Sequence, residues 1–196
     1  MNMRKSYYPF YYIVPFVLLV LLASLALSAL WNSDSDTSNK RGNGAGDIGF
    51  SMLGNPAPDL TLPVYGSQFN TLTLTDWRGK TYAINVFASW CAPCRAEAPS
   101  IARLSQTLPV IGINFRDDMA DAAEFLALFG NPYQAIGVDA TGQASLMLGV
   151  QAIPETLIVN GQGEIIFHQR GPIFADGLAE IAQVLADHAS PKDEAK

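Results

Sequence analysis

The order of apolar segments along this chain predicts an α/β fold, with a mixed central sheet and helices on both faces of the sheet. Two observations lead to this prediction. Short apolar runs typical of buried strands alternate with longer segments in which apolar residues recur at helical spacing. After these alternations, two strand-like runs flank residues 160–163, whose sequence Asn-Gly-Gln-Gly is typical of a hairpin turn.

The first half of the domain is expected to hold two buried strands joined by a helix. Residues 71–75 alternate between polar and apolar and follow turn residues, which indicates a short hairpin. Residues 82–88 and 110–115 are mostly apolar and suit central strands. Between them, apolar residues recur at helical spacing over residues 93–106, and Pro93 stands where a first helical turn tolerates proline. This helix therefore joins the two strands in a parallel crossover.

The second half repeats this pattern and then ends in a hairpin and a helix. Gly130, Asn131 and Pro132 mark the end of one helix. The expected elements are a helix over residues 119–129, a short strand over 135–138, a short helix over 143–148, hairpin strands over 156–159 and 164–168, and a closing helix over 175–188. These segments belong to one domain over residues 50–189.

The N-terminal region predicts a membrane anchor. Residues 10–30 carry no charge, and 18 of these 21 residues are apolar or aromatic, close to the roughly 20 residues that cross a bilayer. Arg4 and Lys5 precede the segment, as expected of a cytoplasmic flank. The alternative is a cleaved signal peptide, because residues 26–28 are small enough for cleavage, but the apolar core exceeds the roughly 7 to 15 residues usual there. We therefore expect residues 1–9 in the cytoplasm and the domain outside it.

Two polar segments flank the domain. Residues 31–49 are small, polar and rich in glycine, which indicates a flexible tether. Residues 190–196 form a solvated tail. Overall, 12 basic residues stand against 18 acidic ones, a net charge of −6. Nucleic-acid binding needs a basic face, so nucleic acid is excluded as a partner.

The chemistry is expected at Cys91 and Cys94, the two cysteines of the chain. They follow a buried strand and open a helix, the context in which a C-x-x-C pair is typical of redox chemistry. Cys91 at the helix N-terminus favours the thiolate and is the expected nucleophile, and the more sheltered Cys94 resolves the mixed disulfide. The alternatives are an inert structural disulfide or a zinc site. Zinc takes four ligands and the only histidines are His168 and His188, so we expect no metal.

A proline before the hairpin adds a second motif. Pro154 directly precedes an expected strand, where a cis peptide bond is plausible. Together, Trp90 to Cys94 and the later Ile153-Pro154 resemble the thioredoxin fold. This resemblance implies a cis Pro154 beside the redox pair and a backbone that pairs with an extended substrate. The expected substrate-binding residues are Trp90, Pro93, Ile153 and Pro154, although Trp90 could equally serve packing.

Further motifs narrow the resemblance. They are NVFASWC at residues 85–91, RAE at 95–97, GINFRDD at 112–118, GNPY at 130–133, and GV at 149–150 with PET at 154–156. In this order they are similar to the CcmG/DsbE family, membrane-anchored thiol:disulfide interchange proteins of cytochrome c biogenesis. The resemblance covers the chain from about residue 54 to the last helix.

The family resemblance implies a function and partners. It implies a periplasmic domain, anchored in the bacterial inner membrane, that reduces the disulfide in the heme-attachment motif of apocytochrome c. Electrons would come from a transmembrane thiol:disulfide carrier, and other cytochrome c maturation components would be partners. No cofactor is expected besides the redox-active disulfide itself. The alternatives are a general tethered reductase for exported proteins, a non-catalytic factor that holds apocytochrome, and a peroxiredoxin.

Two carboxylates are expected to tune the sulfurs. Glu97 lies one turn after Cys94, and Glu155 directly follows Pro154. Either can oppose thiolate formation at Cys91 or accept the proton of Cys94. Thioredoxins commonly carry an aspartate six residues before the first cysteine, whereas this chain has Asn85, which cannot exchange a proton. The alternative for Glu97 is an exposed helical carboxylate.

Other polar residues favour structural roles. Asp117, Asp118, Asp121 and Glu124 are expected to form a solvated face at the start of a helix rather than a metal site. We expect His168 to be packed or hydrogen-bonded rather than a heme ligand.

Overall fold

The computed structural model describes residues 14–15, 17–22, 24, 52–68 and 70–189. The chain divides into two units, Met1–Ile48 and Gly49–Lys196. In the first unit, the described residues are helical. Within the described part of the chain, no helix is both long enough and apolar enough to cross a membrane. The rest of the expected anchor, the tether and the tail lie outside the described residues.

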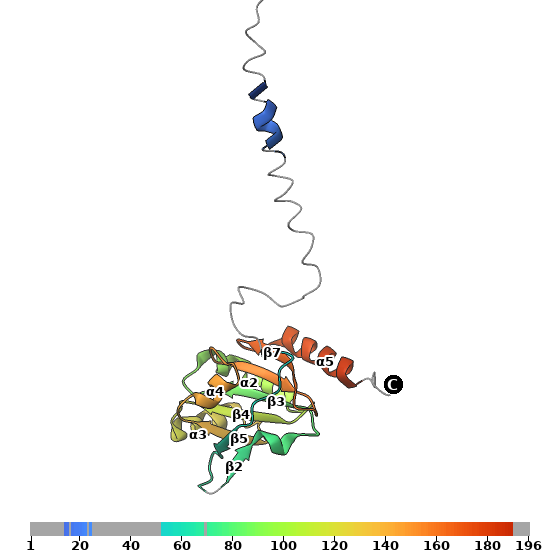
Figure 1. The fold of residues 1–196 in the computed structure, drawn as a ribbon. Coiled ribbons are helices and arrows are strands. Elements are labelled where there is room, and N and C mark those ends of the chain that lie inside the picture. Colours follow the sequence, from blue (N-terminus) through green and yellow to red (C-terminus); the bar gives the residue numbers. More distant parts are fainter. Residues whose placement is uncertain (1–13, 16, 23, 25–51, 69, 190–196) are drawn as a thin grey trace, which may run out of the picture. The chain divides into compact units, whose positions relative to one another are not determined.

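A five-stranded mixed sheet forms the centre of the second unit (Figure 1). Its strands are β3 (Tyr82–Phe87), β4 (Val110–Phe115), β5 (Ala135–Asp139), β6 (Glu155–Val159) and β7 (Ile165–Arg170), and they lie side by side in the order β5-β4-β3-β6-β7. β3, β4 and β5 are parallel, whereas β6 runs antiparallel to β3 and β7 antiparallel to β6. Every residue of β3 is buried, as its apolar sequence requires.

Helices cover both faces of this sheet, as predicted. The elements around it are α2 (Ala92–Leu104), α3 (Met119–Phe129), α4 (Gln143–Met147), α5 (Ala175–Ala189), the hairpin strands β1 (Thr61–Pro63) and β2 (Thr71–Thr73), and the 3-10 helix η1 (Leu74–Trp77). Side chains alternate along β3. Ala83 packs with residues of α2 and α5, and Phe87 packs with Phe125 of α3. Ile84 and Val86 pack instead with residues of α4, β2 and η1.

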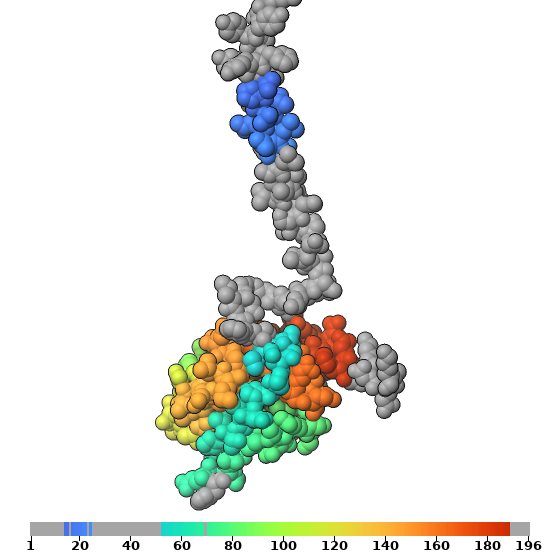
Figure 2. All heavy atoms as spheres, viewed as in Figure 1, coloured from blue at the N-terminus to red at the C-terminus, as the bar shows by residue number. Residues whose placement is uncertain are grey.

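Other backbone segments cover part of each sheet edge. At β7, the amide of Gly54 donates to the carbonyl of Ile165 over 2.8 Å, and the amide of Ile165 donates to Asn55 over 2.9 Å. Figure 2 shows the cyan atoms of this segment against orange atoms of the β6–β7 region. At β5, the amide of Tyr65 donates to Ile136 over 2.8 Å. These contacts reduce the unpaired backbone that edge strands expose.

The predicted elements are confirmed, with small shifts at their ends. The strand over 110–115 and the helix over 119–129 have the predicted bounds. The expected strand over 71–75 is wrong at its end, because the chain turns into η1 at Leu74, whose amide donates to Leu60 over 3.0 Å. β7 continues past His168 because Arg170 still pairs with Glu155 in the sheet.

Candidate active site

Cys91 and Cys94 form a disulfide at the N-terminus of α2, with their Cα atoms 5.3 Å apart. Cys91 is the N-cap residue, in extended conformation, and its Sγ accepts a hydrogen bond from the Cys94 amide over 3.2 Å. Pro93 lies in the first turn, where its missing amide hydrogen leaves no helical bond unmade. The free amides and the helix dipole stabilise negative charge at Cys91, which favours its thiolate once the pair is reduced.

Burial does not distinguish the two cysteines, although Cys94 was expected to be the more sheltered. Cys91 is 3% exposed and Cys94 is 2% exposed. Both pack in an apolar cluster with Phe87 and Phe125, and Ile153 packs against the same cluster. Their positions in the helix separate their roles, because only Cys91 occupies the cap.

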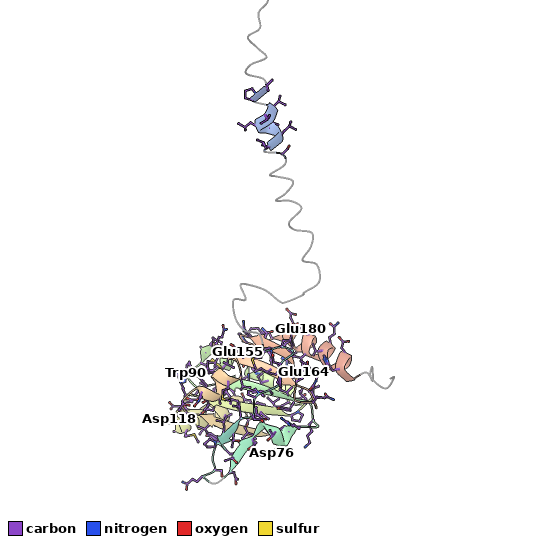
Figure 3. The ribbon with its side chains drawn as sticks, viewed as in Figure 1. Asp76, Trp90, Asp118, Glu155, Glu164 and Glu180 are labelled. Atoms are coloured by element: carbon purple, nitrogen blue, oxygen red, sulfur yellow. A yellow bond between two sulfur atoms is a disulfide. The ribbon has the colours of Figure 1, made fainter. Side chains whose placement is uncertain are left out.

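Trp90 marks the surface of the site. Its side chain is 55% exposed, and Figure 3 shows it at the edge of the domain. Trp90 borders two hollows, of about 510 Å³ and about 370 Å³. Gln151, Ala152 and Ile153 line the larger one, and Asp121 and Phe129 line the smaller one.

Of the other expected substrate-binding residues, Ile153 lines the larger hollow, whereas Pro93 and Pro154 line neither of the two. The Ile153–Pro154 peptide bond is cis. Pro154 is buried, and its carbonyl accepts a hydrogen bond from the amide of Gly171 over 3.0 Å. Pro93 is exposed at the start of α2. The structure therefore brings Trp90 and Ile153 to one hollow, and Ile153 connects that hollow to the cysteines.

Asp117 holds the residue before Trp90 in place. Its carboxylate accepts hydrogen bonds from the amide and the hydroxyl of Ser89, both over 2.6 Å, and from Asn114 Nδ2 over 2.8 Å. The expectation of a solvated acidic face is therefore wrong for Asp117, because its oxygens bind protein donors. Asp118 does cap α3, by accepting from the amide of Ala120 over 2.8 Å. No local pattern indicates the contact between Asp117 and Ser89, because the two residues lie 28 positions apart.

Arg116, which directly precedes Asp117, binds Trp90 itself. Its backbone has a φ of 44°, which is uncommon outside glycine, and its carbonyl accepts a hydrogen bond from Trp90 Nε1 over 3.1 Å. Arg116 Nε donates to the carbonyl of Thr141 over 2.8 Å. Gly142 leaves space for this guanidinium, since a Cβ there would lie 2.6 Å from Arg116 Nε. The indole is thus fixed through a strained residue that sequence reasoning did not single out.

Glu97 is a buried carboxylic acid, so the alternative of an exposed helical carboxylate is wrong. The residue is 1% exposed and lies three positions after Cys94, on the same side of α2. Its Oε1 accepts from Asn85 Nδ2 and its Oε2 from the amide of Ile173, each over 2.9 Å. Burial raises the pKa of Glu97 to about 7, and the two hydrogen bonds lower it in part. A group with this pKa can exchange protons near neutral pH.

Asn85 orients this acid within a network of buried polar groups. Its Nδ2 also donates to Thr156 Oγ1 over 3.0 Å, and its Oδ1 accepts from the hydroxyl of Tyr133 over 2.8 Å. The Tyr133 ring stacks on Phe87 with centroids 4.7 Å apart. Burial, and then the nearby Glu97, raise the pKa of Tyr133 well above its usual value. The sequence placed Tyr133 in the GNPY motif without linking it to Asn85, although an asparagine in an apolar strand signals that buried partners exist.

Glu155 lies on the opposite face of the sheet from Glu97. Thr156 pairs with Asn85 and Glu155 with Val86, so the Glu155 side chain points away from the α2 face. Its Oε1 accepts from the amides of Gln151, over 2.9 Å, and Ala152, over 3.1 Å. Glu155 is 1% exposed and so lies inside the domain, in contrast to Trp90.

The second carboxylate oxygen of Glu155 meets His168. His168 Nε2 lies 2.6 Å from Glu155 Oε2, and the side chain of His168 is 2% exposed. The expectation that His168 is packed and hydrogen-bonded is therefore confirmed. This pair and the Glu97 network are two separate buried polar groups on the two faces of one sheet.

The geometry suits thiol–disulfide exchange. The disulfide lies at a helix N-terminus, and the Cys94 amide donates a hydrogen bond to Cys91 Sγ, so the pair can react through Cys91. Cys94 is bonded to Cys91 in the structure and is therefore close enough to resolve a mixed disulfide between Cys91 and a substrate. In the described part of the chain, no group of three or more His, Cys, Asp or Glu side chains is arranged to hold a metal ion.

Comparison with known proteins agrees with this chemistry. Residues 52–185 match the Redoxin family. The chain is 37% identical to the thiol:disulfide interchange protein DsbE of Pseudomonas fluorescens biotype C. The matched region of 185 residues covers 91% of this chain and 97% of that protein. The chain is also 37% identical over 133 residues to the thiol:disulfide interchange protein HelX of Rhodobacter capsulatus, covering 66% and 74% of the two chains.

A solved structure supports the same assignment. The crystal structure of a DsbE-type protein from Chlorobium tepidum matches with a TM-score of 0.59 and 28% identity, over 68% of this chain and 96% of that one. The match confirms the thioredoxin-like fold that the motifs around Cys91 and Pro154 predicted. This chain therefore belongs to the Redoxin family and, within it, to the CcmG/DsbE thiol:disulfide interchange proteins, and it is a thiol:disulfide oxidoreductase.

Proposed function

We propose that this protein reduces the disulfide in the heme-attachment motif of apocytochrome c during cytochrome c maturation. The observation that carries the proposal is the buried Glu97 one turn after Cys94. A carboxylate beside the sulfurs disfavours thiolates, and a pair whose thiolates are disfavoured gives up electrons more readily. The site is therefore suited to reduce a client disulfide. The similarity to DsbE and HelX supports the same role.

The exchange proceeds in two steps. The Cys91 thiolate attacks one sulfur of the client disulfide, the client S–S bond breaks, and a mixed disulfide forms. Glu97 accepts the proton of Cys94, whose sulfur then attacks Cys91 and releases the client. Two electrons pass from Cys91 and Cys94 to the client, which takes up two protons and leaves as a dithiol. No cofactor is needed beyond the Cys91–Cys94 disulfide.

The chemistry of heme attachment explains why apocytochrome c needs a reductant. A C-x-x-C-H pair in an oxidising compartment tends to close into a disulfide, which cannot form thioether bonds to heme vinyl groups. A dedicated reductant keeps these two thiols free. A transmembrane thiol:disulfide carrier would return Cys91 and Cys94 to the reduced state, and other maturation components would receive the reduced apocytochrome.

The location follows from the N-terminal sequence. Residues 10–30 would anchor the chain in the bacterial inner membrane, and residues 31–49 would tether the domain on the periplasmic side. Protease added to spheroplasts should digest the domain while the anchor stays in the membrane. A domain that resists protease until the membrane is lysed would contradict this orientation.

Trapping in cells tests the proposed client. Cys94→Ala removes the resolving thiol, so the Cys91-linked mixed disulfide should accumulate and contain apocytochrome c. The matched control, Cys91→Ser with Cys94→Ala, cannot form it. Recovery of other exported proteins alone would favour a general tethered reductase. Loss of turnover in Cys91→Ser, with a chemical reductant supplied, would separate catalysis from mere holding of the client.

A further inference from the structure

We propose that His168 is a positioning residue for disulfide exchange, which acts through Glu155 on the loop before Pro154. Glu155 fixes the backbone of Gln151 and Ala152, and His168 fixes Glu155. The inference rests on thiol–disulfide exchange as the activity and does not require apocytochrome c to be the client.

Glu155 ties this loop to the sheet. Gln151 and Ala152 belong to the connection between α4 and β6 and lie outside any helix or strand. Both of their amides donate to Oε1 of Glu155, over 2.9 Å and 3.1 Å. Glu155 is the first residue of β6, which pairs on both sides with neighbouring strands. One carboxylate oxygen therefore holds two consecutive loop amides against the centre of the fold.

His168 completes the binding of this carboxylate. The side chains of Glu155 and His168 are 1% and 2% exposed, so water does not solvate the Glu155 carboxylate. A buried carboxylate needs donors to replace that solvation. A carboxylate accepts, so the Nε2 of His168 donates to Oε2 over 2.6 Å. His168 pairs with Leu157 within β7 and β6, which gives its side chain a rigid base.

The loop that these two side chains hold forms a wall of the active site. Gln151, Ala152 and Ile153 line the same hollow as Trp90, and Ile153 packs against the cluster that contains both cysteines. A substrate that fills this hollow depends on the position of the loop. A small disulfide that meets only Cys91 does not. Displacement of a binding wall by about 1 Å can lower activity by orders of magnitude.

A pair of matched variants tests the proposal. His168→Met removes the donor, whereas His168→Gln keeps an N–H on a side chain of similar length. For each variant we would measure KM and kcat with a disulfide-bonded C-x-x-C-H peptide and with an unrelated disulfide peptide. For each variant we would also measure the rate with oxidised glutathione and the amide hydrogen exchange at Gln151 and Ala152.

The expected result separates positioning from general damage. His168→Met should raise the KM for both peptides about tenfold, the effect of losing one hydrogen bond to a buried charge, and should speed exchange at the two amides. Its kcat and its rate with glutathione should stay within about twofold of the native values. His168→Gln should restore the native KM.

Other outcomes would overturn the proposal. An unchanged KM for the peptides in His168→Met would contradict it. So would a rate with oxidised glutathione that falls as much as the activity with the peptides. If that variant fails to fold, fast exchange at Gln151 and Ala152 in the native protein would also exclude the contact. Failure of the native protein on the C-x-x-C-H peptide alone would count against apocytochrome c as the client and leave the role of His168 standing.

Discussion

Asn85 donates a hydrogen bond to Glu97 over 2.9 Å, between the central strand β3 and the helix that carries both cysteines. Thioredoxins commonly carry an aspartate at the position of Asn85. Here the acid comes from the helix instead, and the strand supplies the amide that orients it. The proposed proton acceptor is thereby placed on the same helix as Cys94, three residues away.

Removal of the Glu97 charge should lower the pKa of the Cys91 thiol. Glu97→Gln keeps an oxygen for Asn85 or Ile173 but cannot ionise, so the Cys91 thiolate loses a repulsive neighbour, and the thiol pKa should fall by about one unit. Glu155→Gln is the matched comparison and should shift this pKa less, because Glu155 lies on the opposite face of the sheet. Ultraviolet absorbance of the thiolate against pH measures both. An unchanged Cys91 pKa in both variants would contradict the hypothesis that these carboxylates tune the thiol.

Stability of the oxidised protein should fall as pH rises toward neutral. The pKa of Glu97 is raised from 4.5 to about 7, so between these values the folded protein binds a proton that the unfolded chain has lost. The free energy of unfolding then decreases with rising pH, by up to about 3 kcal/mol across this window. Urea unfolding at pH 5 and pH 8 measures the change. Glu97→Gln should flatten this dependence and the exposed Glu124→Gln should not; equal slopes in the two variants would contradict the assignment to Glu97.

Loss of the Asp117 carboxylate should destabilise the loop before Cys91. Asp117→Ala leaves the amide and hydroxyl of Ser89 without their acceptor, which should lower the free energy of unfolding by about 2 kcal/mol. Trp90 fluorescence should shift as well, because Trp90 follows Ser89. Glu124→Ala, on the exposed side of α3, is the control and should change stability by less than about 0.5 kcal/mol. Equal effects of the two variants would show that Asp117 is only a surface charge.

Alanine substitutions at two glycines with similar φ angles should distinguish backbone strain from a steric clash with neighbouring side chains. Gly142 has a φ of 79° and Gly163 a φ of 85°, so alanine is strained at either position. At Gly163 an added Cβ meets nothing within 4 Å, whereas at Gly142 it would lie 2.6 Å from Arg116 Nε. Gly163→Ala should therefore cost about 1 kcal/mol, and Gly142→Ala clearly more. Only Gly142→Ala should alter Trp90 fluorescence, and a native spectrum there would disprove the link through Arg116.

Much of the fold could be predicted from the sequence, because its signals are local. The apolar run in β4 and the helical repeat of α3 depend on residues within a few positions of one another. Cys91, Cys94 and the cis bond before Pro154 also follow from short motifs. These features need no knowledge of which distant segments meet.

The polar groups around the site depend on distant contacts and could not be predicted in the same way. Glu97 is buried because Asn85 and the amide of Ile173, 76 positions away, supply its donors. The face on which Glu155 lies is set by the pairing of β6 with β3. Periodicity places Glu155 and Thr156 on opposite faces, but only the strand register shows that Thr156 is the one beside Asn85.

The hydrogen bonds between residues 54–57 and the β6–β7 turn with the start of β7 decide how far the domain can be shortened. A chain that begins at residue 50 keeps the bonds of Gly54 and Asn55 to Ile165 and of Ala57 to Gly163, so this edge of the sheet stays covered without the anchor. A chain that begins at residue 58 would leave the amide and carbonyl of Ile165 free to pair with a second copy. Light scattering of the two truncated proteins should show self-association only in the shorter one.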